Sequence, residues 1–345
     1  MLSHKTFSYK EAFTLESGRK LPELQLFYTT YGKLAADKSN VVWVCHAFSG
    51  SSDFTDWWPG LFGAGKMYDP ADYFIICANM PGGCYGSTGP LSVNPETGKP
   101  FFHDFPLLTN RDIIHAFDLL RQYLGIDKIH TVIGCSLGGQ QAVEWAVTRP
   151  EVFNHLISIG SNASHSPWAI AFNETQRMAI EADSTWVEKN EKAGLGGMKA
   201  ARAVGLLSYR NSIQYNKSQG ESSDDVFDNF RASSYQKYQG EKLAKRFNAF
   251  TYWYLSKAMD SQNVGRNRGG ISKALARIVA RSIFIGITTD ILFPQEEQQF
   301  MADHVKNATF EAIESDYGHD GFLIEYEKLE LILRNFYKAT NAKTA

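Results

Sequence analysis

The chain has 345 residues, 43% of them hydrophobic, and a formal net charge of −2. This length can bury one large core or a core with a smaller inserted domain. The near-neutral charge gives no electrostatic reason to expect nucleic acid or an anionic membrane as a partner. The first ten residues are polar, and no stretch reaches the ~20 consecutive apolar residues that span a bilayer. We therefore expect a cytoplasmic protein with no membrane segment.

The first part of the chain predicts a hairpin that leads into a larger sheet. Phe13–Leu15 and Leu24–Tyr28 flank a polar stretch, residues 16–19, as two antiparallel strands would. Further along, apolar runs of strand length are separated by helical or loop segments: Val41–Ala47, Tyr73–Met80, His130–Ser136, Leu156–Asn162, Ser282–Thr288 and Thr309–Ile313. Their continuous hydrophobicity indicates central strands covered by helices on both faces, which is the pattern of an α/β doubly wound sheet.

A short glycine-rich motif, GCSLGG at residues 134–139, follows the strand-forming residues His130–Ile133 of the third run. In a nucleophile elbow the serine sits on a strained turn between strand and helix, so the residues two before and two after it must be small. Gly134 and Gly138 meet this need around Ser136. The next residues, Gln140–Arg149, have helix-compatible apolar spacing and stop at a proline. Strand, turn and helix therefore come in the required order, with Ser136 as the predicted nucleophile.

Between Ser164 and Ala280 the pattern changes and no strong strand signal occurs. We expect a polar linker around residues 216–228 and helices at Trp168–Ala182, Gly196–Ser208 and Glu241–Met259. This region is interpreted as a helical cap inserted into one sheet domain. The expected division is an α/β core in residues 1–165, a helical cap in residues 166–278, and the rest of the core in residues 279–345.

A serine hydroxyl is a poor nucleophile unless a base takes its proton, and that base needs a third group to hold its tautomer. In α/β-hydrolases the chain order is serine, acid, histidine, each in a loop after a strand. Asp290 follows the run 282–288, and His319 follows the run 309–313. Seen alone, Asp290 could be a helix cap and His319 a surface histidine. Taken in order after Ser136, they predict a catalytic triad.

Acyl transfer also needs two backbone N–H donors for the oxyanion of the tetrahedral intermediate. One comes from the residue after the nucleophile, here Leu137, and the other from a loop after an early strand. Residues 46–50 form such a loop, and the Phe48 N–H is the expected second donor. The alternative is that this loop is a plain glycine-containing turn.

The cysteines occur singly, in or beside strand-like or glycine-rich segments, at Cys45, Cys77, Cys84 and Cys135. This spacing favours buried free thiols over a metal site or a disulfide framework. We therefore expect no bound metal.

Several strings along the chain together resemble the homoserine O-acetyltransferases. They are VCHA at 44–47, WWPGL at 57–61, GGCYGSTGP at 82–90, the elbow followed by EWA at 144–146, IAFNE at 170–174, YQGEK at 238–242, KAMD at 257–260 and YGHD at 317–320. The resemblance runs along nearly the whole chain, cap included. It implies a cytoplasmic enzyme of the α/β-hydrolase fold, commonly a homodimer through cap helices. It also implies transfer of an acetyl group from acetyl-CoA to the side-chain hydroxyl of L-homoserine, a step towards methionine, with no permanently bound cofactor.

The same resemblance assigns roles to single residues. Ser136 is implied as the acylated nucleophile, His319 as the base and Asp290 as its orienting partner. Arg202 matches a cap arginine that contacts the amino-acid carboxylate, and Asp320 matches an acid that binds the α-ammonium. A zwitterionic substrate needs one fixed cation and one fixed anion, which agrees with this pair. The alternatives are a solvated helix charge for Arg202 and a loop-capping carboxylate for Asp320.

The sequence leaves the acyl donor and acceptor open. Relatives of this family transfer succinyl groups or accept serine, and a few are hydrolases. The elbow has Cys135 and Leu137 where the family usually has Gly and Met, which bears on substrate shape more than on the class of reaction. A carboxylesterase with water as the acceptor is therefore an alternative. A non-catalytic binding module of the same fold is another alternative, but the presence of Ser136, Asp290 and His319 together argues against it.

Overall fold

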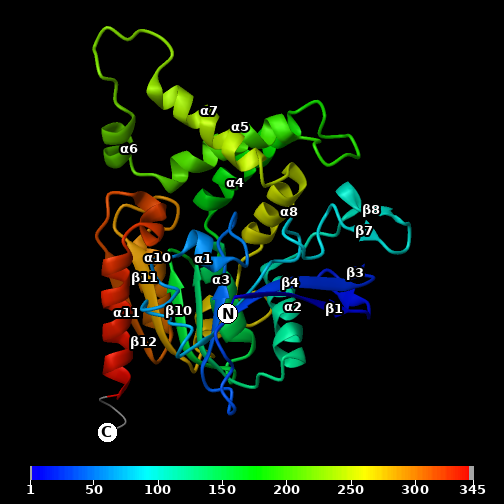
Figure 1. Ribbon diagram of the computed structural model, residues 1–345, viewed down its shortest axis with the longest axis vertical. Helices are drawn as coiled ribbons and strands as arrows, with labels where there is room; N and C mark the ends of the chain where they lie inside the picture. The colour runs from blue at the N-terminus through cyan, green and yellow to red at the C-terminus, as the bar shows by residue number, and fades with distance from the viewer. Residues whose placement is uncertain (1, 342–345) are drawn as a thin grey trace.

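An eight-stranded sheet runs through the centre of the molecule in the computed structural model, which describes residues 2–341 (Figure 1). Its strands, in spatial order, are β1 (Ser3–Tyr9), β4 (Leu24–Tyr31), β6 (Phe74–Ala78), β5 (Val41–Cys45), β9 (Ile129–Cys135), β10 (Phe153–Ile159), β11 (Arg281–Ile287) and β12 (Ala308–Ile313). From β6 to β12 every neighbouring pair is parallel, whereas β4 is antiparallel to both β1 and β6. The predicted mostly parallel α/β sheet is thus confirmed.

All six apolar runs predicted as strands are strands of this sheet. The interpretation as central strands is wrong for the last of them. β12 lies at the edge of the sheet and alternates between partly buried and exposed residues, with only Ile313 buried. An edge strand has a neighbour on one side only, so a short apolar run does not require burial on both faces.

The predicted N-terminal hairpin is wrong in its pairing. Phe13–Thr14 (β2) pairs with Lys20–Leu21 (β3) in a small separate sheet, whereas β4 pairs with the unpredicted strand β1. β1 carries one buried residue, Phe7, and is otherwise partly or fully exposed. Because most side chains of this edge strand are exposed, its sequence has no apolar run, and the strand could not be predicted from hydrophobicity.

Helices cover both faces of the large sheet (Figure 1). One face packs against α1 (Phe54–Trp57) and α11 (Tyr326–Asn341), and the other against α2 (Asn110–Tyr123), α3 (Leu137–Thr148) and α10 (Gln295–His304). Val132 and Ile133 are neighbours in β9 and belong to opposite buried clusters, because successive strand side chains point to opposite faces. Two apolar cores therefore hold the sheet between helical layers.

The segment between β10 and β11 is helical and contributes no strand to the large sheet among the described residues. It comprises α4 (Pro167–Glu181), α5 (Leu195–Tyr209), α6 (Ser212–Gln219), α7 (Arg231–Ala244), α8 (Ala249–Asp260) and α9 (Ile271–Leu275). In Figure 1 helices α4 to α7 stand above the upper end of the sheet. We call α4 to α8 the cap. The ends of the predicted core segments, residue 1 and residues 342–345, lie outside the described part of the chain.

Two predictions inside the cap need correction. The single helix predicted at Glu241–Met259 is two helices, α7 and α8, separated by residues 245–248. Asn248 begins α8, and its side chain accepts a hydrogen bond from the Thr251 amide at 2.8 Å, which is a standard helix N-cap. The predicted polar linker begins inside α6, so only its later part lacks regular structure.

The remaining elements are the strands β7 (Val93–Asn94) and β8 (Lys99–Pro100) and the 3-10 helices η1 (Phe102–Asp104) and η2 (Gly318–Leu323).

Candidate active site

The backbone at Ser136 is strained, as a nucleophile on a tight turn between strand and helix requires. Its φ is +55° and its ψ is −126°, at the junction of β9 and α3. A Cβ on Gly134 would lie 2.2 Å from the Gly138 carbonyl oxygen, and one on Gly138 would lie 2.1 Å from the Cys45 carbonyl oxygen. The turn can therefore form only with glycine on both sides of the serine. The Ser136 amide donates to the Ile159 carbonyl at 2.9 Å, which ties the turn to β10.

Asp290 and His319 lie in contact, although 29 residues separate them in the chain. Asp290 follows β11 and His319 lies in η2 after β12. The His319 Nδ1 and the Asp290 Oδ2 are 2.6 Å apart. The other carboxylate oxygen accepts hydrogen bonds from the amides of Leu292 and Phe293 at 2.8 and 2.9 Å. These bonds hold the carboxylate still, so the imidazole keeps its proton on Nδ1 and presents Nε2.

His319 and Ser136 share a cavity, but no hydrogen bond joins them. Ser136 and His319 both line a cavity of about 250 Å³ between core and cap. The His319 Nε2 is buried and forms no hydrogen bond with any described residue, Ser136 included. A buried nitrogen without a partner is rare unless a ligand or a reaction uses it. In structures without substrate such contacts are often loose and tighten only when substrate binds.

Opposing effects act on the pKa of His319. Burial favours the neutral ring and lowers the pKa. The charge of Asp290, its hydrogen bond to Nδ1 and the charge of Asp320 together outweigh burial, so the pKa is raised above its ordinary value. The site thus favours the positively charged imidazolium that forms when the ring accepts a proton.

Three aromatic rings and one glycine fix the imidazole plane. Phe293 stacks on His319 with centroids 5.1 Å apart, Phe322 meets it edge-on at 5.3 Å, and Tyr209 lies at 5.9 Å. A Cβ on Gly160 would come within 3.3 Å of the ring, and this glycine has a φ of +52°. Sequence reasoning missed all four residues. The nearest sequence signal is that Gly160 and Phe293 each follow a strand of the parallel sheet at the edge where Ser136 lies.

The expected oxyanion loop lies beside the cavity. Phe48 lines it, and Leu137 is the first residue of α3, where the helix amides carry partial positive charge. Neither amide donates to another described residue. His46 holds the loop from inside: Nδ1 donates to the Ala47 carbonyl at 2.9 Å, and Nε2 accepts from the Met80 amide at 3.3 Å. Burial lowers the pKa of His46 to about 4, so the ring is neutral, as this pair of bonds requires.

Arg202 and Asp320 line the same cavity as Ser136. Arg202 comes from α5, its guanidinium lies 5.5 Å from the centre of the Tyr209 ring, and its Nε is buried without a hydrogen-bond partner. Asp320 is paired with Arg210, whose Nη1 is 3.1 Å from Oδ2. The sequence did not predict this ion pair. The cavity that contains Ser136 thus carries a cation from α5 and an anion from η2.

Further cavity-lining residues come from the cap, and sequence reasoning missed them: Tyr209, Arg210, Gln239 and Lys242. Tyr209 lies seven residues after Arg202, so helical periodicity could have placed it on the same face, but the predicted helix ended one residue too early. Arg202, Arg210 and Lys242 give the cavity three basic side chains against one carboxylate, Asp320. The cavity therefore suits anionic groups.

Residues 2–341 contain no group of three or more His, Cys, Asp or Glu side chains placed to hold a metal ion. All four cysteines are free thiols, of which Cys84 is only partly buried. Burial raises the pKa of Cys135, so this thiol next to Ser136 is protonated at neutral pH. Within the same residues, no helix combines the length and apolar character that crossing a membrane takes.

Comparisons with known proteins agree with this geometry. The model of the alpha/beta hydrolase fold family matches residues 40–326. The homoserine O-acetyltransferase of Cyclobacterium marinum is 52% identical over 340 residues, covering 99% of this chain and 97% of its own, and that of Chlorobium chlorochromatii is 42% identical, covering 97% and 96%.

Solved structures give the same picture. The homoserine O-acetyltransferase from Bacillus anthracis superposes with a TM-score of 0.90 at 26% identity, covering 97% of both chains. The acetyl esterase MekB superposes with a TM-score of 0.84 at 25% identity, covering 97% of this chain and 96% of its own. The chain belongs to the homoserine O-acetyltransferase family of the α/β-hydrolase fold.

Proposed function

We propose that this protein transfers an acetyl group from acetyl-CoA to the side-chain hydroxyl of L-homoserine through an acetyl-serine intermediate at Ser136. The observation that carries the proposal is the 2.6 Å contact between Asp290 and His319, with the unpartnered His319 Nε2 and Ser136 on one cavity. The names and high identities of the full-length relatives support the choice of reaction.

In the first half-reaction His319 Nε2 accepts the Ser136 hydroxyl proton as Oγ attacks the thioester carbonyl of acetyl-CoA. The amides of Phe48 and Leu137 stabilise the oxyanion of the tetrahedral intermediate. Its collapse breaks the carbon–sulfur bond, and the CoA thiolate leaves with the proton from His319. Asp290 keeps the imidazole oriented and stabilises its charged form throughout.

In the second half-reaction homoserine enters the cavity vacated by the thiol. His319 accepts the homoserine hydroxyl proton, and the hydroxyl oxygen attacks the acetyl-serine carbonyl. Collapse breaks the bond to Ser136 Oγ, which takes the proton back, and O-acetylhomoserine leaves. Water would compete for the same intermediate, so the acceptor must be held in place of water.

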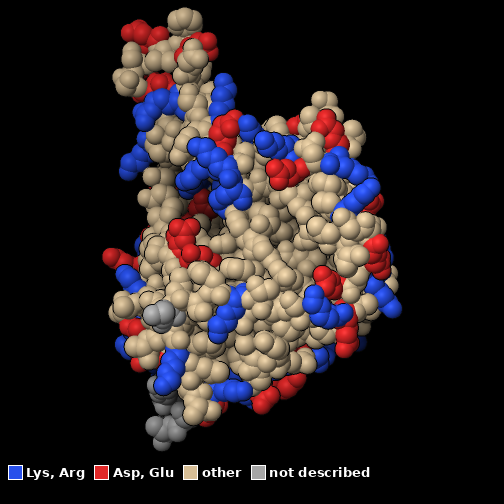
Figure 2. All heavy atoms as spheres, turned by 45° about the vertical axis from the view of Figure 1, so that its right-hand side comes forward, with Lys and Arg blue, Asp and Glu red and all other residues tan. Residues whose placement is uncertain are grey.

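The acceptor is positioned by charges at the cavity wall. Arg202 binds the α-carboxylate, and Asp320 binds the α-ammonium. The Arg210 pair keeps the Asp320 carboxylate oriented until the ammonium arrives. The donor is an anionic nucleotide thioester, and Lys and Arg side chains gathered on the cap (Figure 2) favour the approach of such a molecule.

The direct test follows thiol release from acetyl-CoA with and without homoserine, together with the mass of the product. We expect acceptor-dependent release and O-acetylhomoserine. Ser136→Ala should lower turnover by about 10⁶-fold, since loss of a triad nucleophile costs that much. Ser234→Ala, at an exposed serine of α7, is the matched control and should keep full activity. Full acetyl transfer by Ser136→Ala would contradict the proposal.

The same assay identifies the preferred acyl donor and the preferred acceptor. Succinyl-CoA and L-serine replace acetyl-CoA and homoserine in turn, and the proposal expects the highest kcat/KM for acetyl-CoA with homoserine. A higher value for succinyl-CoA or serine would keep the acyl-serine mechanism but change the substrates.

A second candidate function is ester hydrolysis, with water as the acceptor. It is favoured by the superposition on the acetyl esterase MekB at a TM-score of 0.84. The variant Arg202→Ala distinguishes acetyl transfer from ester hydrolysis. Under transfer, the variant should raise the homoserine KM sharply and leave hydrolysis of a neutral ester such as p-nitrophenyl acetate nearly unchanged. The rate at which water hydrolyses the acetyl-serine of the wild-type enzyme is also compared with and without homoserine. Equal rates would favour the esterase.

We also propose a homodimer formed through the cap, in the cytoplasm. Large apolar side chains that stand exposed on the cap support this assembly: Leu207, Ile213, Phe227, Phe230 and Tyr238. Burying such side chains against a second copy would remove apolar surface from water.

A further inference from the structure

A cap arginine reaches across to the loop that contains Phe48. Arg246 lies in the break between α7 and α8. Its Nη1 donates a hydrogen bond to the Ser49 carbonyl at 2.7 Å and another to the Tyr85 hydroxyl. Ser49 is 197 residues away in the chain and directly follows Phe48. The cap is thereby tied to the residue next to the expected oxyanion donor.

The rest of this loop is held by core residues. His46 fixes its beginning, as described above, and the Asn79 Oδ1 accepts from the Ser52 amide at 2.5 Å. The Asn79 Nδ2 donates to the Tyr85 carbonyl at 2.5 Å, so Tyr85 is itself anchored. Among the described residues, the side chain that holds the Ser49 carbonyl is that of Arg246. The Gly50 amide donates to the Ala47 carbonyl at 2.9 Å, so Phe48 and Ser49 are the central residues of a turn, and Arg246 holds the carbonyl of the second of them.

The same stretch of the cap also forms part of the cavity wall. Gln239 and Lys242 of α7 line the cavity with Ser136, and Arg246 follows them at helix-like spacing just beyond the end of α7. A shift of this stretch would therefore move the cavity wall and the Ser49 carbonyl together.

We propose that Arg246 is a positioning residue, which fixes the Phe48 N–H in the orientation that stabilises the oxyanion. This inference rests on the proposed acyl-serine reaction and names a cap residue on which that reaction depends. The guanidinium touches no reacting atom. It acts by holding the Ser49 carbonyl, two peptide groups beyond the one that contains the Phe48 N–H, because a fixed donor costs no reorganisation when the negative charge develops.

The test compares Arg246→Ala, Arg246→Lys and the control Lys245→Ala. Lys245 is the exposed neighbour, and its side chain forms no hydrogen bond or ion pair with the described residues. Two quantities are measured: the rate of acyl-enzyme formation from acetyl-CoA or p-nitrophenyl acetate, and the partition of the acyl-enzyme between homoserine and water. The ester assay works even if homoserine is not the acceptor, so failure of the proposed function and failure of this inference are distinguishable.

We expect Arg246→Ala to slow acyl-enzyme formation about tenfold, less than the ~10²–10³ lost when an oxyanion donor is removed outright. Attack by homoserine and by water pass through the same oxyanion, so their ratio and the homoserine KM should stay unchanged. Arg246→Lys should restore part of the rate, since one ammonium can reach the Ser49 carbonyl, and Lys245→Ala should match the wild type. Equal rates for Arg246→Ala and Lys245→Ala would overturn the inference. So would a raised homoserine KM or a changed partition at an unchanged acylation rate, which would indicate a role in cap closure.

Discussion

The imidazole of His319 is buried, and yet its surroundings favour the charged ring. Burial beside Phe293 and Phe322 would by itself make a poor base, because it disfavours the protonated form. The Asp290 carboxylate, held by two backbone amides, reverses this preference. A residue that would be inert in an apolar core becomes able to accept a proton from a hydroxyl.

This balance predicts the pH dependence of acylation. His319 must be neutral to act as a base, so the rate should fall as the pH drops through its pKa. We expect the acid limb of acylation by p-nitrophenyl acetate above the ordinary histidine value of about 6.5, since the pKa of His319 is raised. Asp320→Asn should move this limb to lower pH, because the charge of Asp320 is one cause of the rise.

The control for this experiment is Asp316→Asn. Asp316 is exposed on the same loop and should leave the pH profile unchanged. A neutral ester has no ammonium group, so binding effects of Asp320 do not enter the measurement. A wild-type limb below the ordinary histidine value, or an upward shift in Asp320→Asn, would contradict the account of His319.

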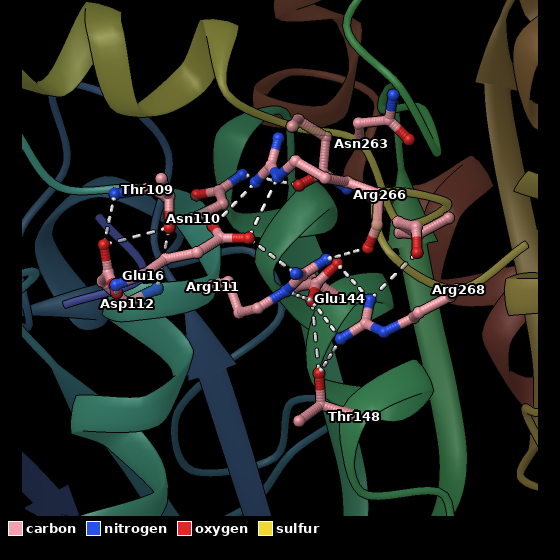
Figure 3. Close-up of polar contacts among 12 residues, drawn as sticks. Glu16, Thr109, Asn110, Arg111, Asp112, Glu144, Thr148, Asn263, Arg266 and Arg268 are labelled. Atoms are coloured by element: carbon pink, nitrogen blue, oxygen red, sulfur yellow. Dashed lines mark hydrogen bonds and ion pairs between the residues drawn. The ribbon is translucent and has the colours of Figure 1, made fainter. Parts of the chain in front are cut away.

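At the scale of elements, the helix that follows the nucleophile is anchored by a buried network of charges (Figure 3). Glu144 of α3 has a side chain that is 2% exposed, and it pairs with Arg111 of α2 at 2.8 Å and with Arg268 at 2.7 Å. Arg268 belongs to the segment that returns from the cap to the core, and it also donates to Thr148. Arg111 pairs in turn with Glu16 of the N-terminal hairpin at 2.6 Å. One carboxylate thus joins two helices to the return segment.

Removing that carboxylate should destabilise the protein strongly. Breaking a buried ion pair from one side leaves the partner charge buried and costs about 3–5 kcal/mol. We therefore expect Glu144→Ala to lower the free energy of unfolding by about that amount, measured by chemical denaturation. Glu16→Ala is the matched control, because its side chain is 19% exposed, Arg111 keeps its pair with Glu144, and the other arginine it frees, Arg266, is 34% exposed. Equal losses for the two variants would show that the burial of Glu144 has no special importance.

At the scale of the whole molecule, the cap is attached by two connectors that run side by side. One leaves β10 and the other returns from α8, and they are bridged at Ser164 and Asn263. The His165 amide donates to the Gln262 carbonyl and the Val264 amide to the Ala163 carbonyl, each at 2.9 Å. Paired connectors limit independent movement, so the cap side chains keep their places over Ser136.

The proposed dimer is testable through Phe227, whose 92% exposure is the largest among the exposed apolar residues described here. Phe227→Asp should shift the mass measured by sedimentation from dimer to monomer, because a carboxylate would be buried at the interface. Leu331→Asp on α11 is the matched control: Leu331 is 62% exposed but lies on the core, and the dimer should persist. A wild-type protein that sediments as a monomer at micromolar concentration would contradict the proposed assembly.

Local patterns in the sequence were sufficient to predict the parallel strands of the large sheet and to name the residues expected at the site. Buried parallel strands show as continuous apolar runs, and the turn at Ser136 demands glycine at positions that can be counted along the chain. Asp290 and His319 were predicted because each follows a run of strand length, and parallel strands end at one edge of the sheet. These inferences depend on neighbours in sequence or on strand order alone.

The cap contacts were decided by the tertiary structure. The helix predicted at Glu241–Met259 breaks at residues 245–248, and this break places Arg246 against Ser49. Arg210 likewise pairs with Asp320, which is remote from it in the sequence, and β1 joins the sheet only by pairing with β4. The residues in these contacts lie in segments without a periodic pattern of apolar residues. Their partners depend on how the cap and the sheet pack together, and a local sequence pattern does not contain that information.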